Sequence, residues 1–504
     1  MHVASLRSDV DTASSVRRRA PSGRALISAA SWMSGANLVA QGLAYVALVV
    51  LARLLPPGSF GIVAAGTAIV WMAIVVLESG TRGSVIVRPR LTHDALRLAF
   101  RRCLFVALIL AAAMAATAPQ IVDSTARGGD AAVLAVLAIS LPLYAVALIP
   151  MAVLERTMQF GKLARMTAAS NVGSAGVAVI AGLAGLGVWA LVARQLLWFA
   201  LLAGLAAVLA RPYLPRRAPG QAGHDRAAAT PVGDRWFLVF GATLLLTMNL
   251  DYLVIGGVDG VDALGLYALA FMIAFAPLQQ FSSEVGRVLF AAAAASGYES
   301  SGARTLHAVR AMAALLLPLI PAAVALAPAV LPALLGDEWT GMVAPFQVLV
   351  VVGIGQAVVN CVGETLSGVG QIAFRAKLNI VWCAATLLAL LLLVPADGIR
   401  GAALAHLAVF APYLAAYATV GARRAGTTTR ELWGVLRPTV VAVGCQSAVT
   451  AALAIGLHDV AGDAAAPAGA LAGLLTAAVM MTRDRGGPVR ELASLVRGSG
   501  GGGQ

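Results

Sequence analysis

The chain has 504 residues, of which 60% are hydrophobic and only 12% are charged, and its formal net charge is +13. In a soluble protein such a charge would suggest nucleic acid, but the sequence has no recognisable nucleic-acid-binding motif, and its few aromatic residues lie mostly in apolar runs. The composition is typical of a polytopic membrane protein, in which positive charge follows topology. We therefore expect membrane lipids, and no nucleic acid, among its partners.

Apolar runs long enough to cross a bilayer recur along the chain. About 20 residues of helix are needed to cross roughly 30 Å of hydrocarbon. The sequence predicts fourteen such spans, at residues 27–51, 61–79, 99–118, 131–153, 168–184, 187–209, 236–257, 264–285, 310–335, 343–366, 376–394, 400–420, 436–457 and 465–482. We therefore predict an all-α membrane protein of about 14 transmembrane helices.

The longest connection, 211–235, lies between the sixth and seventh predicted spans and is rich in Pro, Gly and charge, as a linker between two six-helix halves would be. The expected parts are a disordered basic tail at 1–26, an N-lobe at 27–210, the linker at 211–235, a C-lobe at 236–421, spans 13 and 14 within 422–482, and a flexible tail at 483–504. The four cysteines stand singly in helical segments, so the sequence indicates no disulfide, metal site or cofactor.

Positive charge falls almost entirely on one side of the predicted membrane. Of the 36 Lys and Arg residues, 32 lie in the two tails or in one set of loops. The other set of loops holds only Arg53, Arg127 and Arg400, and Arg194 lies within a span. Because cytoplasmic loops carry an excess of Lys and Arg, we predict a multi-pass plasma-membrane protein with both termini cytoplasmic. Arg outnumbers Lys 34 to 2 and Ala is abundant, which indicates a GC-rich bacterial genome.

A short internal repeat supports the division into halves. Residues 50–64 (VLARLLPPGSFGIVA) align without gaps on 254–268 (VIGGVDGVDALGLYA), which places Gly61 opposite Gly265. Both segments end one span, turn on the same side and begin the next span, as expected of parallel repeats related by an axis along the membrane normal. Chance similarity between two Gly- and Val-rich hairpins is the alternative.

Several segments resemble one known family. They are 52–61 (ARLLPPGSFG), 78–80 (ESG), 85–88 (VIVR), 249–270 (NLDYLVIGGVDGVDALGLYALA), 287–290 (RVLF) and 335–339 (LGDEW). On these segments the chain resembles the polysaccharide flippases of the multidrug/oligosaccharidyl-lipid/polysaccharide exporter superfamily. The match is partial after RVLF, because the family usually has a proline there and this chain has five alanines at 291–295.

The resemblance implies two six-helix lobes that face each other around a central cavity, with helices 13 and 14 packed alongside. It also implies a substrate in which an oligosaccharide is linked to a polyprenyl diphosphate. Such a flippase moves its substrate from the inner to the outer leaflet by alternating access, for export of a surface polysaccharide or exopolysaccharide. We expect a monomer, with a polysaccharide polymerase or glycosyltransferases as further partners.

Two polar stripes interrupt otherwise apolar spans. On the first span they are Ser34, Asn37, Gln41 and Tyr45, and on the tenth they are Gln356, Asn360 and Glu364, all at helical spacing. Such stripes are expected to line a polar path between the lobes. The alternative is that these side chains hydrogen-bond neighbouring helices and hold the bundle together. Gln279 and Gln280, next to Pro277, are further candidates for lining the same space.

Charged residues within or beside the spans are candidates for substrate and ion contacts. Arg194, inside the sixth span, suits a diphosphate, although it can instead extend to the interface or form a local ion pair. Arg82 and Arg88 are placed to attract a diphosphate from the cytoplasmic leaflet, but each is also an ordinary topology charge. Asp251 is the acidic candidate for cation coupling, or else the partner of an arginine or a group in the aqueous mouth. His406 is expected to be a neutral imidazole hydrogen-bonded across helices.

Two other function classes compete with a glycolipid flippase. A multidrug or small-solute exporter of the same superfamily would share the fold. A membrane-embedded glycan polymerase or ligase would need acid, base or metal-binding groups gathered at a wet face, whereas the acidic residues of the predicted outward loops are dispersed. The sequence therefore predicts a transporter and not an enzyme.

Overall fold

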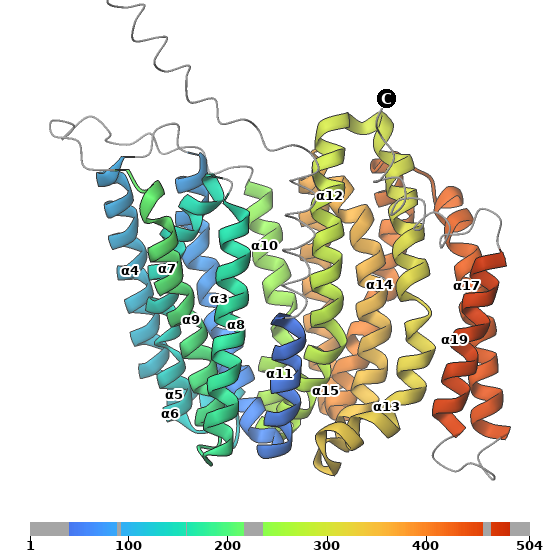
Figure 1. Ribbon diagram of the computed structural model, residues 1–504, viewed down its shortest axis with the longest axis horizontal. Coiled ribbons are helices and arrows are strands. Elements are labelled where there is room, and N and C mark those ends of the chain that lie inside the picture. The colour runs from blue at the N-terminus through green and yellow to red at the C-terminus, as the bar shows by residue number, and fades with distance from the viewer. Residues whose placement is uncertain (1–39, 88–91, 158, 216–234, 457–464, 484–504) are drawn as a thin grey trace, which may run out of the picture.

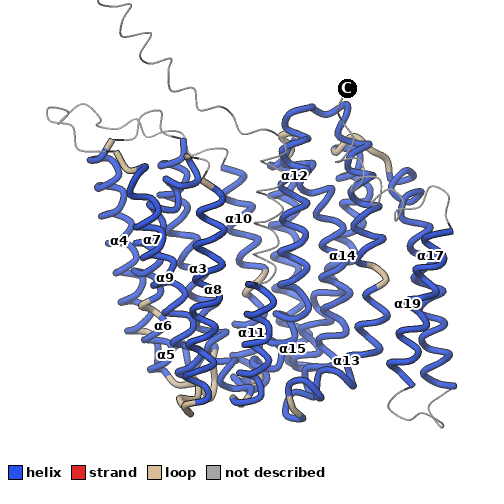
Figure 2. The backbone as a smooth tube through the Cα atoms, viewed as in Figure 1, coloured by secondary structure: helices blue, strands red, loops and turns tan. Residues whose placement is uncertain are grey.

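The computed structural model describes residues 40–87, 92–157, 159–215, 235–456 and 465–483. Within these ranges the chain consists of helices joined by short connections, and no strand occurs (Figures 1 and 2). The helices stand side by side in one row of bundles, with helices of the first half of the chain at one side and α17 and α19 at the other (Figure 1).

Fourteen apolar helical segments occur in the described part of the chain. Eleven are long and apolar enough to cross a membrane, and one of these, Ile372–Arg424, is broken at Asp397 and Gly398 and therefore counts twice. Two shorter apolar helices, Ala40–Leu54 and Ala466–Met480, complete the set. The all-α prediction is confirmed, while the part of the first predicted span before residue 40 lies outside the described residues.

The first lobe contains helix Ala40–Leu54 and the elements α3 to α9. Their bounds are α3 Pro57–Val87, α4 His93–Ala116, α5 Ala118–Thr125, α6 Ala131–Leu137, α7 Ser140–Arg156, α8 Phe160–Leu183 and α9 Trp189–Ala210, followed by the 3₁₀ turn η1 Arg211–Tyr213. Local signals start these helices. Pro57 occupies the first position of α3, and Asp130 caps α6 by accepting from the backbone N–H of Ala132 at 2.8 Å.

The second lobe contains α10 to α16. Their bounds are α10 Arg235–Thr247, α11 Leu250–Val258, α12 Gly260–Leu316, α13 Leu319–Leu335, the 3₁₀ turn η2 Asp337–Met342, α14 Val343–Gly368, α15 Ile372–Ala416, the π-helical turn η3 Tyr417–Gly421 and α16 Ala422–Arg424. The last two helices, α17 Thr429–Gly456 and α19 Ala465–Arg483, pack against each other and against α13. The chain therefore has two lobes and a C-terminal helix pair.

Helix breaks differ from those expected along the second lobe. Residues 286–309, expected to separate two spans, continue α12 without interruption, because they contain many helix-forming alanines and no proline. The break comes instead at Leu317 and Pro318, before α13. The seventh span, expected as one helix over 236–257, is divided at Met248 and Asn249 into α10 and α11.

The two lobes meet closely at one end of the bundle, where α3 and α12 begin. A Cβ added to Gly61 would overlap the carbonyl oxygen of Val261, and a Cβ added to Gly265 would overlap that of Pro57. Only glycine allows the two helices to approach this closely. The internal repeat pairs Gly61 with Gly265 and Pro57 with Val261, so the two halves make the same contact on each other.

Further contacts between the lobes lie at the same end. The backbone of Arg127, after α5, accepts from the N–H of Val261 at 2.9 Å and donates to the carbonyl of Gly256 at 3.2 Å. Arg53 donates through Nε to the carbonyl of Leu334 at 2.7 Å and through Nη2 to that of Ala333. We call this end, at the bottom of Figure 1, the closed end, and the opposite end the Arg375 end, after a residue described below.

Candidate functional site

Trp339 anchors the second lobe to the first at the closed end. Its side chain is fully buried, and its indole N–H donates to the carbonyl of Ala52 at 2.9 Å. The ring meets Phe60 edge to face, with centroids 5.2 Å apart. The motif LGDEW at 335–339 thus places a large aromatic side chain against the first segment of the internal repeat, and both segments were singled out by the sequence.

An apolar cleft lies between the lobes next to this closure. It has a volume of about 320 Å³ and is lined by Tyr45 of helix Ala40–Leu54, Ile273 of α12, Phe346 of α14 and the adjoining face of α13. Tyr45 belongs to the predicted polar stripe of the first span. Gln356 and Asn360, the stripe expected opposite, are not among the residues lining this cleft.

Arg194 of α9 lies beside Tyr45 of helix Ala40–Leu54, which belongs to the same lobe. Its guanidinium and the phenol of Tyr45 are close enough to interact electrostatically, and Arg194 is half-buried. The next residue, Gln195, accepts a hydrogen bond from the hydroxyl of Thr67 on α3. An arginine that sequence reasoning placed within a span therefore lies beside a phenol that lines the cleft.

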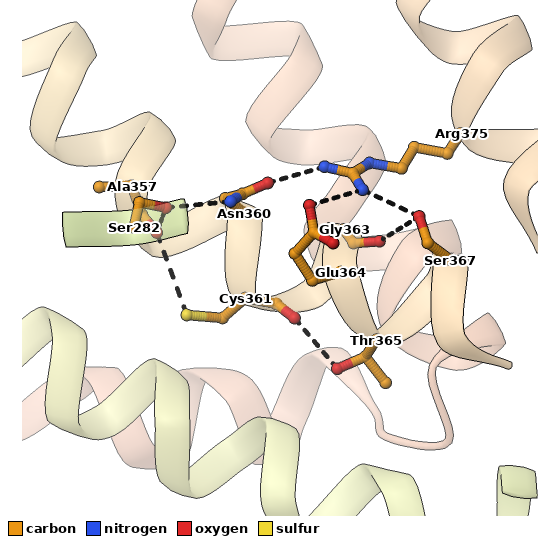
Figure 3. A network of polar contacts seen from close by, with 9 residues as sticks. All are labelled: Ser282, Ala357, Asn360, Cys361, Gly363, Glu364, Thr365, Ser367 and Arg375. Atoms are coloured by element: carbon orange, nitrogen blue, oxygen red, sulfur yellow. Dashed lines mark hydrogen bonds and ion pairs between the residues drawn. The ribbon is translucent and has the colours of Figure 1, made fainter. Parts of the chain in front are cut away.

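A second polar cluster, centred on Arg375, lies in the second lobe at the Arg375 end (Figure 3). Arg375 Nη1 donates to Glu364 Oε1 and to Ser367 Oγ, both at 2.9 Å, and Nη2 donates to Asn360 Oδ1 at 2.7 Å. The amide of Asn360 donates in turn to Ser282 Oγ of α12 at 3.0 Å. One arginine at the start of α15 thus joins three residues of α14 and, through one of them, α12.

The cluster is packed as well as hydrogen-bonded. Arg375 is only 6% exposed, and its guanidinium lies 4.3 Å from the ring centroid of Phe240 on α10. A tight corner between α14 and α15 brings the arginine back onto α14. Gly370 has φ of 80° there, and the N–H of Gln371 bonds the carbonyl of Leu366 at 2.8 Å.

Sequence reasoning missed Arg375, which was counted among the cytoplasmic topology charges. The signal available was weak: a lone Arg shortly after a Gly-containing turn, with Asn360 and Glu364 one helical turn apart before it. Both ends of the Asn360 amide are occupied by neighbouring side chains. Asn360 therefore joins helices in this structure.

Asp251 and His406 form a third polar group, nearer the closed end. Asp251 Oδ2 lies 3.5 Å from His406 Nε2, and their side chains are 0% and 4% exposed. Asp251 lies in the first turn of α11, just after the break in the seventh span, and its Oδ1 accepts from the N–H of Tyr252 at 3.0 Å. The sequence singled out both residues, but as separate features, and the structure brings them together.

The remaining predicted residues take varied positions. Gln41 and Gln356 are half-buried, as is Gln280, whereas Gln279 is exposed. Pro277, beside these last two, lies inside the unbroken α12. Asn37 and Arg88 lie outside the described residues, and Arg82 lies in α3 without a described side chain. Their contribution to a substrate path stays a prediction.

The sequence matches a family described as polysaccharide biosynthesis protein over residues 50–344, more than half of the chain. It is similar to the teichuronic acid biosynthesis protein TuaB of Bacillus subtilis (strain 168), with 33% identity over 165 residues, or 31% of this chain and 33% of TuaB. It is also similar to the lipopolysaccharide biosynthesis protein WzxC of Escherichia coli (strain K12), with 21% identity over 359 residues, or 70% of this chain and 72% of WzxC. The alignment thus spans about a third of TuaB and most of WzxC.

The fold is similar to that of a solved lipid II flippase, MurJ, in its inward closed conformation. The TM-score is 0.67 at 9% sequence identity, and the match covers 89% of this chain and 97% of MurJ. At that identity the likeness concerns the fold alone. Together with the two lobes and the motifs at 52–61 and 335–339, these matches show that the chain belongs to the polysaccharide biosynthesis protein family, among the polysaccharide flippases of the multidrug/oligosaccharidyl-lipid/polysaccharide exporter superfamily.

Proposed function

We propose that this protein is a flippase that moves polyprenyl-diphosphate-linked oligosaccharide from the inner to the outer leaflet by alternating access, for export of a surface polysaccharide or exopolysaccharide. The observation that carries the proposal is the equivalent contact of the two lobes at Gly61 and Gly265. Where two helices touch backbone to backbone, no interdigitated side chains have to be pulled apart when the lobes tilt. A bundle that is closed at one end by such a crossing suits a transporter that opens its two ends in turn.

The charge distribution supports placing the closed end outside. The three cations of the sparsely charged set of loops all lie at the closed end: Arg53 near the end of helix Ala40–Leu54, Arg127 in the turn after α5, and Arg400 just after the break in α15. Arg375 and Lys377, at the opposite end, belong to the set that holds 32 cations. On the positive-inside rule the Arg375 end is cytoplasmic, so both termini are cytoplasmic and the described conformation is shut toward the outside.

A polyprenyl-diphosphate glycan has three chemically distinct parts, and the chain offers candidate contacts for each. The apolar cleft suits the tail. Arg194 supplies a guanidinium beside Tyr45 for the diphosphate, and Arg82 and Arg88 attract the anion at the cytoplasmic side. The half-buried Gln41, Gln280 and Gln356, together with Asn37 and Gln279, supply amides for sugar hydroxyls.

Asp251 is proposed as the residue that couples transport to a cation. It is a fully buried carboxylate at the break of a discontinuous span, which is a typical place for coupling ions in transporters. The cycle makes and breaks no covalent bond in this proposal, so the protein acts as a transporter and not as an enzyme. Glycosyltransferases or a polysaccharide polymerase would act before and after it.

A multidrug or small-solute exporter is the second candidate function, because the lining of the cleft is apolar and would also suit an amphipathic solute. The test uses purified protein in liposomes with a fluorescent polyprenyl-diphosphate oligosaccharide in both leaflets and an impermeant quencher added outside. We expect the quencher to remove more fluorescence than the outer-leaflet glycolipid alone accounts for. In protein-free liposomes it should remove only the fluorescence of the outer leaflet.

A phospholipid that carries the same fluorophore serves as the specificity control and should stay in its leaflet. Failure of the protein to move the glycolipid, under a proton or sodium gradient or without one, would refute the proposed function. Equal movement of the phospholipid would also refute it. Accumulation of amphipathic dyes without glycolipid movement would favour the exporter.

A further inference from the structure

The pair formed by Asp251 and His406 is buried without the hydrogen bonds that such groups usually have. Asp251 Oδ2, His406 Nε2 and the hydroxyl of Tyr267 are all inaccessible to solvent, and none has a hydrogen-bond partner among the described residues. The gap of 3.5 Å between the carboxylate oxygen and the imidazole nitrogen is an ion-pair distance and is longer than a well-made hydrogen bond. Three polar atoms from α11, α12 and α15 therefore converge without satisfying one another.

Aromatic rings surround the pair. Tyr252 of α11 meets Tyr267 and Phe271 of α12 edge to face, at centroid distances of 6.3 Å and 5.9 Å. The His406 ring lies 6.3 Å from Phe271, which in turn stacks on Phe275 at 4.4 Å. Such rings keep water away, so that any charge on the pair is weakly solvated.

No arginine or lysine offsets the pair in the described part of the chain. The titratable groups that face it are Tyr252 on α11, Tyr267 on α12 and His406 on α15. Among the described side chains of other helices packed on α11, Glu78 of α3 accepts a hydrogen bond from Tyr144, and Asp123 of α5 is exposed.

The charge of the pair depends on a single proton. With that proton the pair is neutral overall, as carboxylate with imidazolium or as carboxylic acid with imidazole. Without it, an isolated negative charge remains in an aromatic enclosure. Burying an unpaired charge is costly, whereas a proton between Oδ2 and Nε2 neutralises it and gives both atoms a partner. Loss and gain of this proton therefore change the free energy of packing α11 against α15.

The available ligands suit a proton better than a metal cation. Sodium, like other hard cations, takes several oxygen ligands, but here one carboxylate faces an imidazole nitrogen and a phenol. Imidazole is the side chain whose proton affinity lies in the physiological range. The broken seventh span places this group where a small shift of α11 against α15 changes its access to solvent.

We propose that Asp251 and His406 bind one proton between them and that this shared proton is the coupling ion of the transport cycle. The coupling role rests on the flippase function proposed above, whereas proton binding does not. Neutral and deprotonated pairs favour different arrangements of α11 against α15, so an ion gradient acts on the lobes through this contact.

Proton binding is tested on the purified protein in lipid nanodiscs without glycolipid. Nitrogen NMR of labelled histidine follows His406, which is identified by the signal lost in His406→Gln, while carbon NMR of labelled aspartate follows Asp251. Both signals are followed between about pH 4 and 9. We expect the His406 nitrogen and Asp251 carboxyl signals to change together as the pair gains one proton, and we expect Asp251→Asn to alter the His406 response. Asp259→Asn and His307→Gln, at exposed positions, should leave it unchanged.

An ionised Asp251 beside an imidazole that stays neutral over this range would overturn the proposal. So would a His406 midpoint that is the same with and without Asp251. The same titration is repeated with sodium chloride in place of potassium chloride. If sodium displaces the proton at constant pH, the site binds sodium instead.

Coupling is tested in the liposome assay with an imposed pH gradient. We expect Asp251→Asn and His406→Gln each to lose at least tenfold of the gradient-driven rate, whereas Asp259→Asn and His307→Gln should keep it. Unchanged dependence on the gradient in both variants would overturn the coupling role. A protein that binds the proton but moves no glycolipid would instead refute the flippase function and leave the proton site standing.

Discussion

The second lobe contains two buried ionic groups, and they differ in how completely their hydrogen bonds are made. Arg375 donates to Glu364, Ser367 and Asn360 at 2.7–2.9 Å and packs on Phe240. Asp251 and His406 face each other at 3.5 Å, and the facing atoms have no other partner in the described residues. Arg375 Nε has no partner among the described residues, but the three hydrogen bonds from Nη1 and Nη2 fix one arrangement of the helices, whereas the unsatisfied pair is sensitive to a proton.

Their places in the fold agree with this difference. Arg375 lies at the corner between α14 and α15, where consecutive helices have to be held in one geometry (Figure 3). Asp251 and His406 link the broken seventh span to the part of α15 that follows the break at Asp397 and Gly398. These two segments are far apart in the sequence. Asp251 lies eight residues, about 12 Å of helix, from Asp259 at the closed end. We expect mutations in the first group to affect stability and mutations in the second to affect ion dependence.

The largest loss of stability is expected for Arg375→Ala. Removing the guanidinium leaves Glu364 and Asn360 without their donor, and breaking a buried pair costs about 3 kcal/mol when one partner keeps some contact with solvent. Thermal unfolding in detergent measures the effect. Arg375→Lys should recover only part of it, because an ammonium cannot reach three acceptors in one plane.

Lys377→Ala is the matched control for Arg375, since Lys377 is an exposed cation two residues further along the same helix. It should leave the unfolding temperature nearly unchanged. Equal losses in Arg375→Ala and Lys377→Ala would show that the cluster contributes no more than an ordinary surface charge.

A smaller effect, on the balance of conformations, is expected for Gly265→Ala. The added methyl group meets the carbonyl oxygen of Pro57, so the crossing at the closed end has to widen at a cost of about 1–3 kcal/mol. Spin labels on the two lobes should report a larger population of separated closed ends. Gly241→Ala, where nothing lies within 4 Å of the new methyl group, should leave the distance distribution unchanged.

Asp251→Asn should barely change stability, in contrast to Arg375→Ala. The amide keeps the volume and can donate to His406, so we expect the free energy of unfolding to change by less than about 1 kcal/mol in either direction. Thermal unfolding at neutral pH measures this. A loss as large as that of Arg375→Ala would mean that the Asp251–His406 pair is a structural ion pair and would remove the contrast between the two groups.

The smallest effect is expected for Asp259→Asn at the closed end. Partial desolvation raises the pKa of the largely exposed Asp259 carboxyl, so folding shifts this group slightly toward its neutral form. Any stabilisation by this residue is then complete below its pKa in the unfolded chain and is lost as pH rises through its pKa in the folded protein. Asp259→Asn should therefore give a slightly higher unfolding temperature at neutral pH and no gain near pH 3. A gain that is larger at low pH would contradict this.

Hydropathy predicted the helices well because burial in lipid acts on every residue of a span. It could not locate breaks that depend on single side chains. Asn249 donates to the carbonyl of Leu245 at 2.7 Å and so satisfies the end of α10 within the seventh span, where the sequence shows only an apolar run with a polar interruption. Conversely, the alanines after 290 continue α12 where a loop was expected.

The candidate sites were predicted less well, because they depend on how helices rotate against one another. Gly61 and Gly265 were paired by the internal repeat, and the structure places both in equivalent contacts. Asp251 and His406 were each recognised as unusual within a span, but no local pattern joins residues of the seventh and twelfth spans. Arg375 resembled the other cations near span ends, and only its burial distinguishes it.

The most direct test of the account locks the closed end. Gly58 and Asp262 occupy equivalent positions of the repeat on opposite lobes, and a Cβ on Gly58 would lie 3.4 Å from Asp262 Cγ, which is close enough to suggest a disulfide between cysteines there. The pair Gly58→Cys and Asp262→Cys is introduced after the four native cysteines are replaced, and glycolipid translocation is measured in liposomes. If the closed end opens in every cycle, oxidation abolishes translocation and a reductant restores it. Full translocation by the cross-linked protein would contradict the account.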